Sequence, residues 1–294
     1  MREHLQNVSE LTVGQVEFFQ KNGYLVVEQA LEPQLLVGLQ QQFDKWVEES
    51  RDQVEPYGET INGKPRFDLE PGHSYDKPGL RRVNAPVEIS KDYYEAMSES
   101  RVPGMVANLI GPDVKFHHSK INSKLPGGQT EVKWHQDFPF TPHSNDDLVT
   151  ALIMIDDVTE ENGPLQVVPG SHLGDIHGLW HDGVFTGAVE QNVASDCEQE
   201  SISCTGPAGS VCLMHTRLLH GSTANQSEHS RTLFICVYSA DDAIPCSANP
   251  MPNRHEGIIV SGERCGRIRC TPFEMMTPQL PQTASFFDQQ AEQQ

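Results

Sequence analysis

The stretch LVTALIMI at positions 148–155 decides the fold class, because it is a short apolar run bounded by polar residues. A run of this length, with β-branched residues, predicts a buried strand. Similar β-prone runs lie at positions 114–123, 165–168, 210–214 and 232–238. Turn clusters punctuate these runs, namely PGG at 126–128, ENG at 161–163 and PGS at 169–171. Many short strands at such spacing predict a mainly β domain, and we expect a core of jelly-roll type.

The N-terminal part of the chain has a helical pattern. Thr12 is suited to cap a helix, and Asn22-Gly23 supplies a left-handed stop for it. A second helix is expected to begin at Pro33 and to run to about Ser50. A third is expected over positions 91–110, and the polar stretch between the last two predicts loops or short strands.

These patterns predict one domain over residues 1–281, with its helical part at 9–112 packed outside a jelly-roll core at 113–270. A split into two domains near residue 112 is the alternative. The Gln-rich stretch at 282–294 is expected to be a disordered tail.

Composition excludes several classes of protein. The chain has 294 residues and a formal net charge of -20, which makes a nucleic-acid partner unexpected. No apolar run reaches the roughly 18 residues of a membrane span, and the polar N-terminus does not resemble a signal peptide. None of the seven cysteines forms a C-x-x-C pair. We therefore expect a cytoplasmic protein with reduced thiols.

The stretch KWHQDF at positions 133–138 contains the first candidate metal ligands, His135 and Asp137. On or beside a strand, positions i and i+2 face the same way, so one imidazole and one carboxylate would project together. A third candidate, His220, lies in HTRLLHGS at positions 215–222. Two histidines and one carboxylate are the ligand set of non-haem Fe(II) oxygenases, with three coordination positions left open.

A His-x-Asp motif alone is weak, since chance gives roughly one in a chain of this composition. Arg231 strengthens the prediction, because it lies at the start of an apolar run shortly after His220. A cation that enters a buried strand needs an anionic partner, and arginine binds carboxylates in a bidentate manner. The alternative is an arginine at a strand end with its guanidinium in water.

Together these motifs resemble the phytanoyl-CoA dioxygenase family. The resemblance runs from about Leu11 to Tyr238 and rests on WHQDF, NGPLQVVPGSH at 162–172, HTRLLHGS, Arg231 and the N-terminal F-x-x-x-G-Y-L-V-V. It implies a double-stranded β-helix core and an enzyme that uses Fe(II), 2-oxoglutarate and O2 to oxidise a small molecule, releasing succinate and CO2. Hydroxylation is the reaction expected by default, and halogenation is disfavoured because halogenating relatives lack the carboxylate that Asp137 supplies.

The resemblance also implies roles for individual residues. Iron would be bound by His135, Asp137 and His220. The cosubstrate 2-oxoglutarate would be bound by Arg231, Ser222, Asn122 and Arg82, of which Arg82 rests on the loosest alignment.

The substrate pocket is less defined by sequence. In the alternating run at 114–124, one face is shared by His118, Lys120, Asn122 and Lys124, and we take Lys120 and His118 as candidate substrate contacts. Trp134 and His172 are further candidates, although packing explains Trp134 as well. With Arg82, Lys120 would make a cationic pocket for an anionic or zwitterionic metabolite; surface lysines on an edge strand are the alternative.

Two other functions use the same residues. One is a non-redox metalloenzyme with zinc on the same three ligands. The other is a non-catalytic small-molecule-binding protein on the same scaffold, which would need neither an intact ligand set nor Arg231.

Overall fold

The run at 148–155 forms β7 (Leu148–Met154), a fully buried interior strand of a nine-stranded antiparallel sheet. The computed structural model describes residues 10–128 and 130–279. The nine-stranded sheet has the strand order β1 (Tyr24–Val27), β12 (Val211–His215), β7, β14 (Arg231–Ala240), β5 (Val114–Lys124), β4 (Leu80–Asn84), β3 (Pro65–Leu69) and β2 (Tyr57–Glu59), with β15 (Ile259–Ser261) paired to β5.

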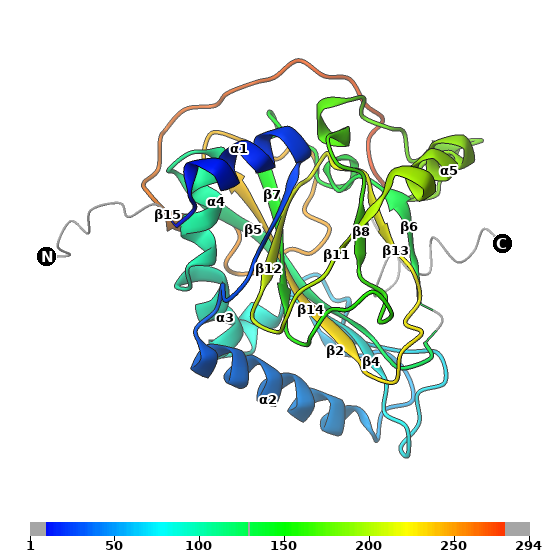
Figure 1. Ribbon diagram of the computed structural model, residues 1–294. Helices are drawn as coiled ribbons and strands as arrows, with labels where there is room; N and C mark the ends of the chain where they lie inside the picture. Colours follow the sequence, from blue (N-terminus) through cyan, green and yellow to red (C-terminus); the bar gives the residue numbers. More distant parts are fainter. Residues whose placement is uncertain (1–9, 129, 280–294) are drawn as a thin grey trace, which may run out of the picture.

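A smaller antiparallel sheet forms the second layer (Figure 1). Its order is β11 (Ile202–Cys204), β8 (Leu165–Val167), β13 (His220–Ser222) and β6 (Val132–His135), and a separate hairpin pairs β9 (Trp180–His181) with β10 (Val184–Phe185). Apolar side chains from both sheets form one buried cluster, to which Leu152, Leu165 and Met214 belong. The expected jelly-roll core is confirmed.

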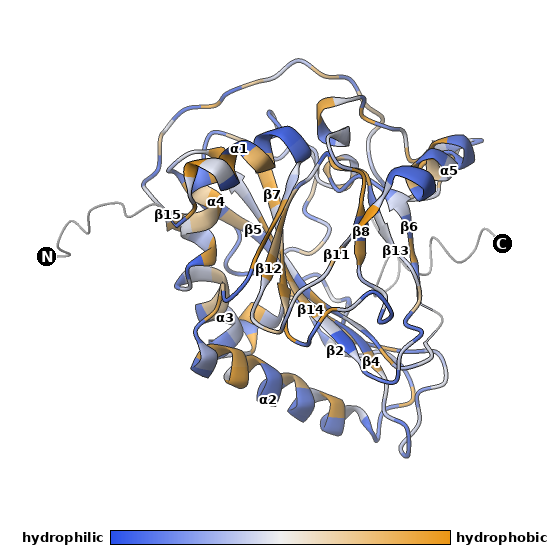
Figure 2. Cartoon of the chain, in the orientation of Figure 1, coloured by the Kyte–Doolittle hydropathy of each residue, from blue (hydrophilic) through white to orange (hydrophobic). Residues whose placement is uncertain are grey.

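Helices cover the outer face of the nine-stranded sheet (Figure 1). They are α1 (Val13–Asn22), α2 (Pro33–Ser50), α3 (Lys91–Ser98) and α4 (Val102–Ile110), whereas α5 (Gln191–Glu200) lies beside the smaller sheet, and three short 3-10 turns span Pro86–Glu88, Phe138–Phe140 and Ser171–Leu173. Figure 2 shows apolar residues along β7, β12 and β14, where the helices cover them. In α2, Leu39, Phe43 and Trp46 are buried against this sheet.

The first two helices begin and end as the sequence predicts. Thr12 accepts a hydrogen bond from the backbone N–H of Gln15 in a capping box, and Gly23 ends α1 with a φ of 78°. Pro33 stands in the first turn of α2.

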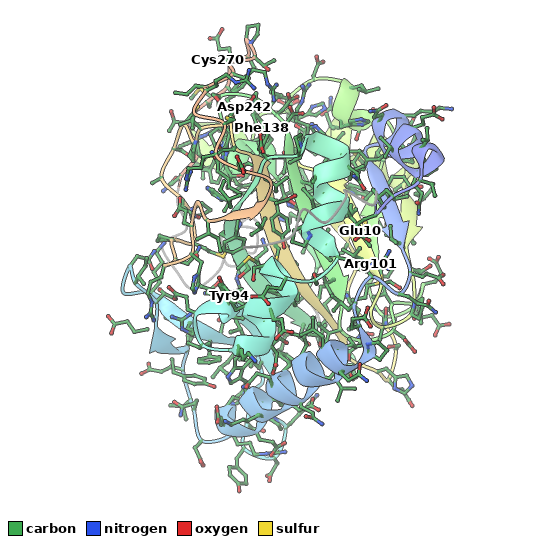
Figure 3. All side chains as sticks on the ribbon, turned by 90° about the vertical axis from the view of Figure 1, so that its left-hand side faces the viewer. Glu10, Tyr94, Arg101, Phe138, Asp242 and Cys270 are labelled. Carbon is green, nitrogen blue, oxygen red and sulfur yellow. The ribbon has the colours of Figure 1, made fainter. Side chains whose placement is uncertain are left out.

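The prediction of one helix over 91–110 is wrong, because the chain breaks between α3 and α4. Pro103 lies in the first turn of α4, where the missing N–H costs little, and it would disrupt a continuous helix. Ser100 hydrogen-bonds the carbonyl of Ala96 (2.6 Å), which satisfies one free acceptor at the end of α3. Arg101, which lies in this break, forms a salt bridge with Glu10 (2.8 Å; Figure 3). The salt bridge holds the α3–α4 connection against the segment that precedes α1.

The part at 9–112 is not only helical, because β1 to β4 extend the nine-stranded sheet. β1 pairs with β12 at one edge, and β4 pairs with β5 toward the other. The predicted tail at 282–294 lies outside the described residues. Within the described residues, no helix combines the length and apolar character needed to cross a bilayer.

Candidate metal centre and its two cavities

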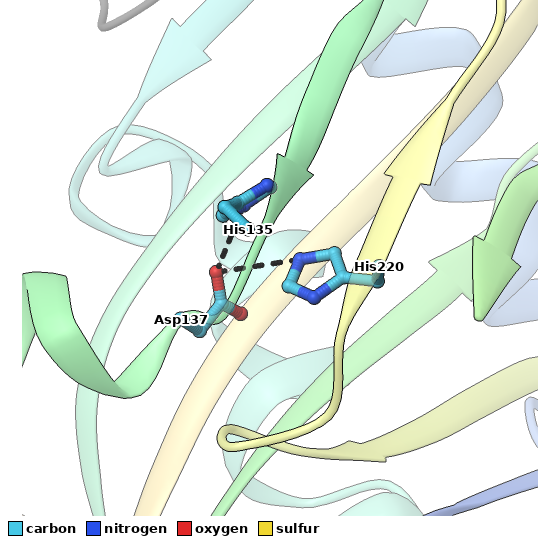
Figure 4. A group of neighbouring side chains, drawn as sticks. All are labelled: His135, Asp137 and His220. Atoms are coloured by element: carbon cyan, nitrogen blue, oxygen red, sulfur yellow. Dashed lines mark ion pairs between the residues drawn. The ribbon is translucent and has the colours of Figure 1, made fainter. Parts of the chain in front are cut away.

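The two sheets bring His135, Asp137 and His220 together (Figure 4). His135 ends β6 and His220 begins β13, and the two residues are direct partners in the antiparallel ladder. Asp137 follows β6 by two residues, so its side chain returns to the same face as His135. Its Oδ1 lies 3.6 Å from Nε2 of each histidine, and one donor atom from each of the three side chains lies within 4.8 Å of the others.

Backbone carbonyls fix the orientation of both imidazoles. Nδ1 of His135 lies 2.8 Å from the carbonyl oxygen of Lys133, and Nδ1 of His220 lies 2.9 Å from that of Leu218. A carbonyl only accepts, so Nδ1 carries a proton in each ring, and Nε2, which faces Asp137, is the nitrogen placed to bind a metal. This is the arrangement that metal-ligating histidines normally show.

Asp137 is held as an ionised carboxylate. Burial would raise its pKa, but the two neighbouring histidines hold that pKa well below its usual value. Burial, followed by the neighbouring His220, lowers the pKa of His135, so that ring is neutral near pH 7. Thr150 on β7 donates a hydrogen bond to Oδ2 of Asp137 (2.7 Å), which leaves Oδ1 for the metal. Neutral imidazoles and an ionised carboxylate are the states that bind a divalent metal, and the donor set fits Fe(II).

Gln136 points away from the metal ligands on either side of it. Its amide nitrogen donates to the carbonyls of Asp175 (3.0 Å) and Arg217 (2.6 Å), and its oxygen accepts from the N–H of His177 (2.8 Å). The Arg217 carbonyl belongs to the turn that leads into His220. One buried amide therefore connects the segment that carries two ligands to the segment that carries the third.

Two cavities meet at the metal ligands, and both are lined by His135, Asp137, Thr150 and Lys120. The first, which we call the Arg231 cavity, brings together Asn122, Ser222 and Arg231, as the resemblance implies for 2-oxoglutarate. The second, which we call the Arg82 cavity, is lined by residues that include Lys64, Arg82, Asn84, His118, Thr141, Val237 and Met251.

Arg231 is a buried cation with a neutral protein partner. Its Nε and one terminal nitrogen donate to the carbonyl of Gly163 (3.1 and 2.6 Å). Burial lowers its pKa to about 10, against the opposing effect of Asp156, so it stays protonated at neutral pH. Within the described residues, no carboxylate oxygen lies within 4.0 Å of it. The buried Oδ1 of Asn122 has no hydrogen-bond partner in the same part of the chain. These groups fit an incoming oxoacid that ends in a carboxylate.

The remaining predicted residues lie in different parts of the structure. Arg82 lines the Arg82 cavity and not the Arg231 cavity, where the resemblance had placed it. It donates to Asn84 (2.9 Å) and contacts the sulfur of Met251 (3.4 Å). Lys120 and His118 line the Arg82 cavity as expected.

Trp134 and His172 line neither cavity. Trp134 is buried in the apolar cluster of the smaller sheet and α5, because alternation along β6 turns it away from His135. His172 bonds the carbonyl of Gln20 (3.1 Å) and lies 5.2 Å from the His215 ring, between ring centres, so it contacts α1 and β12 instead of an entrance.

Sequence reasoning missed Thr150, Gln136 and Lys64, and it gave Lys124 no role although it placed this residue on the strand face shared by Lys120 and Asn122. Thr150 had a signal, because it is the polar residue in the apolar run LVTALIMI.

The chain matches known proteins over most of its length. The family model for phytanoyl-CoA dioxygenase matches residues 19–233. A probable alpha-ketoglutarate-dependent hypophosphite dioxygenase of Stutzerimonas stutzeri is 35% identical over 214 residues, which is 70% of this chain and 71% of that protein. An ectoine dioxygenase of Stutzerimonas stutzeri (strain A1501) is 25% identical over 272 residues, covering 85% of each chain.

Solved structures agree on the fold. EctD from S. alaskensis with bound Fe superposes with a TM-score of 0.64 at 20% identity, over 92% of this chain and 90% of the other. The non-heme alpha ketoglutarate dependent carbocyclase SnoK gives a TM-score of 0.62 at 20% identity, over 86% and 94% of the two chains. Motifs, fold and sequence matches agree, and the chain belongs to the phytanoyl-CoA dioxygenase family.

Proposed function

We propose that this family member oxidises a small anionic or zwitterionic metabolite bound in the Arg82 cavity. The chain is an Fe(II)- and 2-oxoglutarate-dependent dioxygenase of a small molecule, with hydroxylation as its expected reaction. The supporting observation is electrostatic. The two cavities are lined by Lys64, Arg82, Lys120, Lys124 and Arg231, and among the described residues Asp137 is their one carboxylate, although the whole chain has a formal net charge of -20.

Each group in the site has a separate task in this proposal. His135, Asp137 and His220 hold Fe(II) on one face, and Thr150 keeps the second carboxylate oxygen of Asp137 away from it. When bound, Fe(II) supplies the coupling of O2 reduction and 2-oxoglutarate decarboxylation to substrate oxidation. Arg231, Ser222 and Asn122 bind 2-oxoglutarate.

Arg82 and Lys120 hold the anionic group of the substrate, so that its target C–H faces the metal. Arg82 is buried, with only 4% of its surface exposed, and Lys120 is half-buried. Charge-assisted hydrogen bonds from such groups are short and directional. Ile235 and Val237 line the same cavity and limit the access of water. His118 lines the same cavity as an uncharged side chain, because burial holds its pKa well below the usual value.

The names of the relatives fit a compact charged substrate. Those names specify hypophosphite, ectoine and L-proline. Hypophosphite is a small anion, and proline is a zwitterion at neutral pH. A cavity with cations on one side suits the anionic group of either chemistry.

A substrate screen read by succinate formation tests the proposal. The library pairs each carboxylate, phosphonate or phosphinate with its neutral amide or ester on the same carbon skeleton. We expect the anionic or zwitterionic member of each active pair to stimulate succinate formation more strongly. Equal stimulation by the neutral members would contradict the proposed substrate class while leaving the dioxygenase assignment intact.

Substitution of Arg82 tests whether the substrate binds in the Arg82 cavity. Arg82→Met should raise the KM for an active anionic substrate by about tenfold or more, since a charged hydrogen bond is lost. Any succinate formation without substrate should not change, because Arg82 lies outside the Arg231 cavity. Product mass should rise by one oxygen, and a chlorinated product in high chloride would contradict the role of Asp137.

A further inference from the structure

The Arg231 cavity contains a second buried cation whose role is unassigned. Lys124 is the last residue of β5, and it is the direct partner of Arg231 on β14 in the antiparallel ladder. Both side chains line the same cavity. Because Asn122 lies two residues earlier, alternation puts it and Lys124 on the same face of the strand.

The surroundings of Lys124 are neutral at close range. It is 4% exposed, and its Nζ donates to Oγ of Ser222 (2.8 Å) and to the carbonyl oxygen of Thr223. Within the described residues, no carboxylate oxygen lies within 4.0 Å of Nζ. Burial, and then the charge of Arg231, lowers the pKa of Lys124 well below its usual value. A buried ammonium beside a buried guanidinium is unfavourable unless an anion joins them.

The turn at Gly163 holds both cations in place. Its carbonyl accepts from Arg231, and its φ is 75°. A Cβ at this position would lie 3.0 Å from Cδ of Lys124 and 2.6 Å from the carbonyl oxygen of Thr223. Glycine is therefore required for the turn to pack against the Lys124 stem while it positions Arg231. The N-G-P motif thus shapes a pocket with two cations.

We propose that Lys124 and Arg231 together bind the carboxylate of 2-oxoglutarate that lies remote from the iron, with Ser222 as a neutral donor between them. A carboxylate has two oxygens and about four lone-pair sites, so it can accept from both cations and the hydroxyl. Lys124 thereby gives the site its preference for a dicarboxylic 2-oxoacid over a monocarboxylic one. Arg231 alone would supply one charge for this selection, and Lys124 adds a second.

The alternative is that Lys124 is a structural residue whose hydrogen bonds to Ser222 and Thr223 only join β5 to the loop after β13. The glutamates Glu70 and Glu131 would then balance its charge from a distance. The two explanations differ in one respect. A structural residue affects the binding of every 2-oxoacid alike, whereas a ligand of the remote carboxylate affects only those that have one.

The test is calorimetric titration of the Fe(II)-loaded protein without oxygen, using 2-oxoglutarate and pyruvate. Pyruvate has the same 2-oxoacid end but lacks the remote carboxylate. Lys124→Met should weaken 2-oxoglutarate binding by about ten- to a hundredfold, the usual range for a charged hydrogen bond. Pyruvate binding should stay within about twofold of the unaltered protein.

Lys115→Met is the matched control. Lys115 is a buried lysine on the same strand, and its Nζ donates to the carbonyl of Asp241 (2.8 Å) away from both cavities. We expect this variant to bind both oxoacids normally. Lys124→Gln is the second variant in the event that Lys124→Met does not fold, because glutamine keeps a donor without the charge. Unchanged 2-oxoglutarate binding, or an equal loss for both oxoacids, in a folded Lys124 variant would overturn the proposal.

Discussion

At the scale of single residues, the metal ligands depend on neighbours that touch no metal. Thr150 donates to the outer oxygen of Asp137, and it is nearly fully buried beside both cavities. Thr150→Val keeps the shape of the side chain and removes this hydrogen bond. We expect Fe(II) affinity or turnover to fall by about 10- to 100-fold, the usual effect of losing such a partner. Thr150→Ser should restore both in Fe(II) titrations, and a Thr150→Val protein with normal iron affinity and turnover would refute this role.

Arg231 should act on the cosubstrate and leave the metal unaffected. Arg231→Met removes one partner of a buried charge pair, which costs roughly 3–5 kcal/mol, or about two to four orders of magnitude in affinity. The 2-oxoglutarate concentration for half-maximal succinate formation should rise accordingly, while Fe(II) binding changes little. Arg254→Met, at a largely exposed arginine, is the control. An unchanged 2-oxoglutarate requirement in the Arg231 variant would assign that carboxylate to another residue.

The charge of Lys120 gives the proposed substrate binding a pH dependence. Burial, together with the charge of Arg82, lowers the pKa of Lys120 to about 8, against the opposing effect of Asp137. The side chain is therefore charged below about pH 8 and loses its charge above it. The KM for an anionic substrate should be flat at lower pH and rise above pH 8. Lys120→Arg should remove this rise, and a wild-type KM that stays flat from pH 7 to 9 would contradict the role of Lys120.

Residues whose role is encoded in a short local motif could be predicted from the sequence, whereas residues whose role depends on a tertiary contact could not. His135, Asp137, His220 and Arg231 belong to short motifs whose residue types state their chemistry. Thr150 takes its role from the contact between β7 and the turn after β6, and that contact requires the tertiary structure.

At the scale of elements, the segments that carry the ligands are joined by Gln136. Gln136→Leu would remove three hydrogen bonds and leave two carbonyls and one N–H without this partner. We expect the free energy of unfolding to fall by about 2–4 kcal/mol, together with weaker Fe(II) binding. Denaturant unfolding of the metal-free protein measures the first effect. Gln41→Leu, at an exposed position of α2, should show neither, and equal stability of the two variants would exclude a connecting role for Gln136.

Long patterned elements were predicted more reliably than short ones. α2 has a proline start and an apolar stripe, so its bounds follow from local sequence. β13 has only three residues, His220 to Ser222, and no apolar alternation, so its pairing with β6 and β8 decides that it is a strand. The break between α3 and α4 was missed because each side has a helical pattern, although Pro103 was its local signal.

At the scale of the whole molecule, the surface and the cavities differ in charge. The whole chain has a formal net charge of -20, whereas the two cavities are lined mainly by cations among their charged residues. Composition alone therefore argued against a nucleic-acid partner but did not fix the sign of the pocket, which the alternation of Lys120 with Asn122, together with Arg82, predicted to be cationic. The turn-separated β-prone runs were enough to predict the jelly roll. They did not predict that β1 to β4 would extend its larger sheet, because the attachment depends on the pairing of β1 with β12 and of β4 with β5, far along the chain.

The central claim is that His135, Asp137 and His220 hold an iron that couples 2-oxoglutarate decarboxylation to substrate oxidation. The most direct measurement is succinate formation by the purified protein with 2-oxoglutarate and O2, loaded with Fe(II) or with Zn(II), beside His220→Ala. We predict succinate only with Fe(II), stimulation by the substrate found in the screen, and loss of activity in His220→Ala, because a two-ligand site lacks the facial geometry. Full activity in His220→Ala, or substrate turnover with zinc and no succinate, would contradict the account.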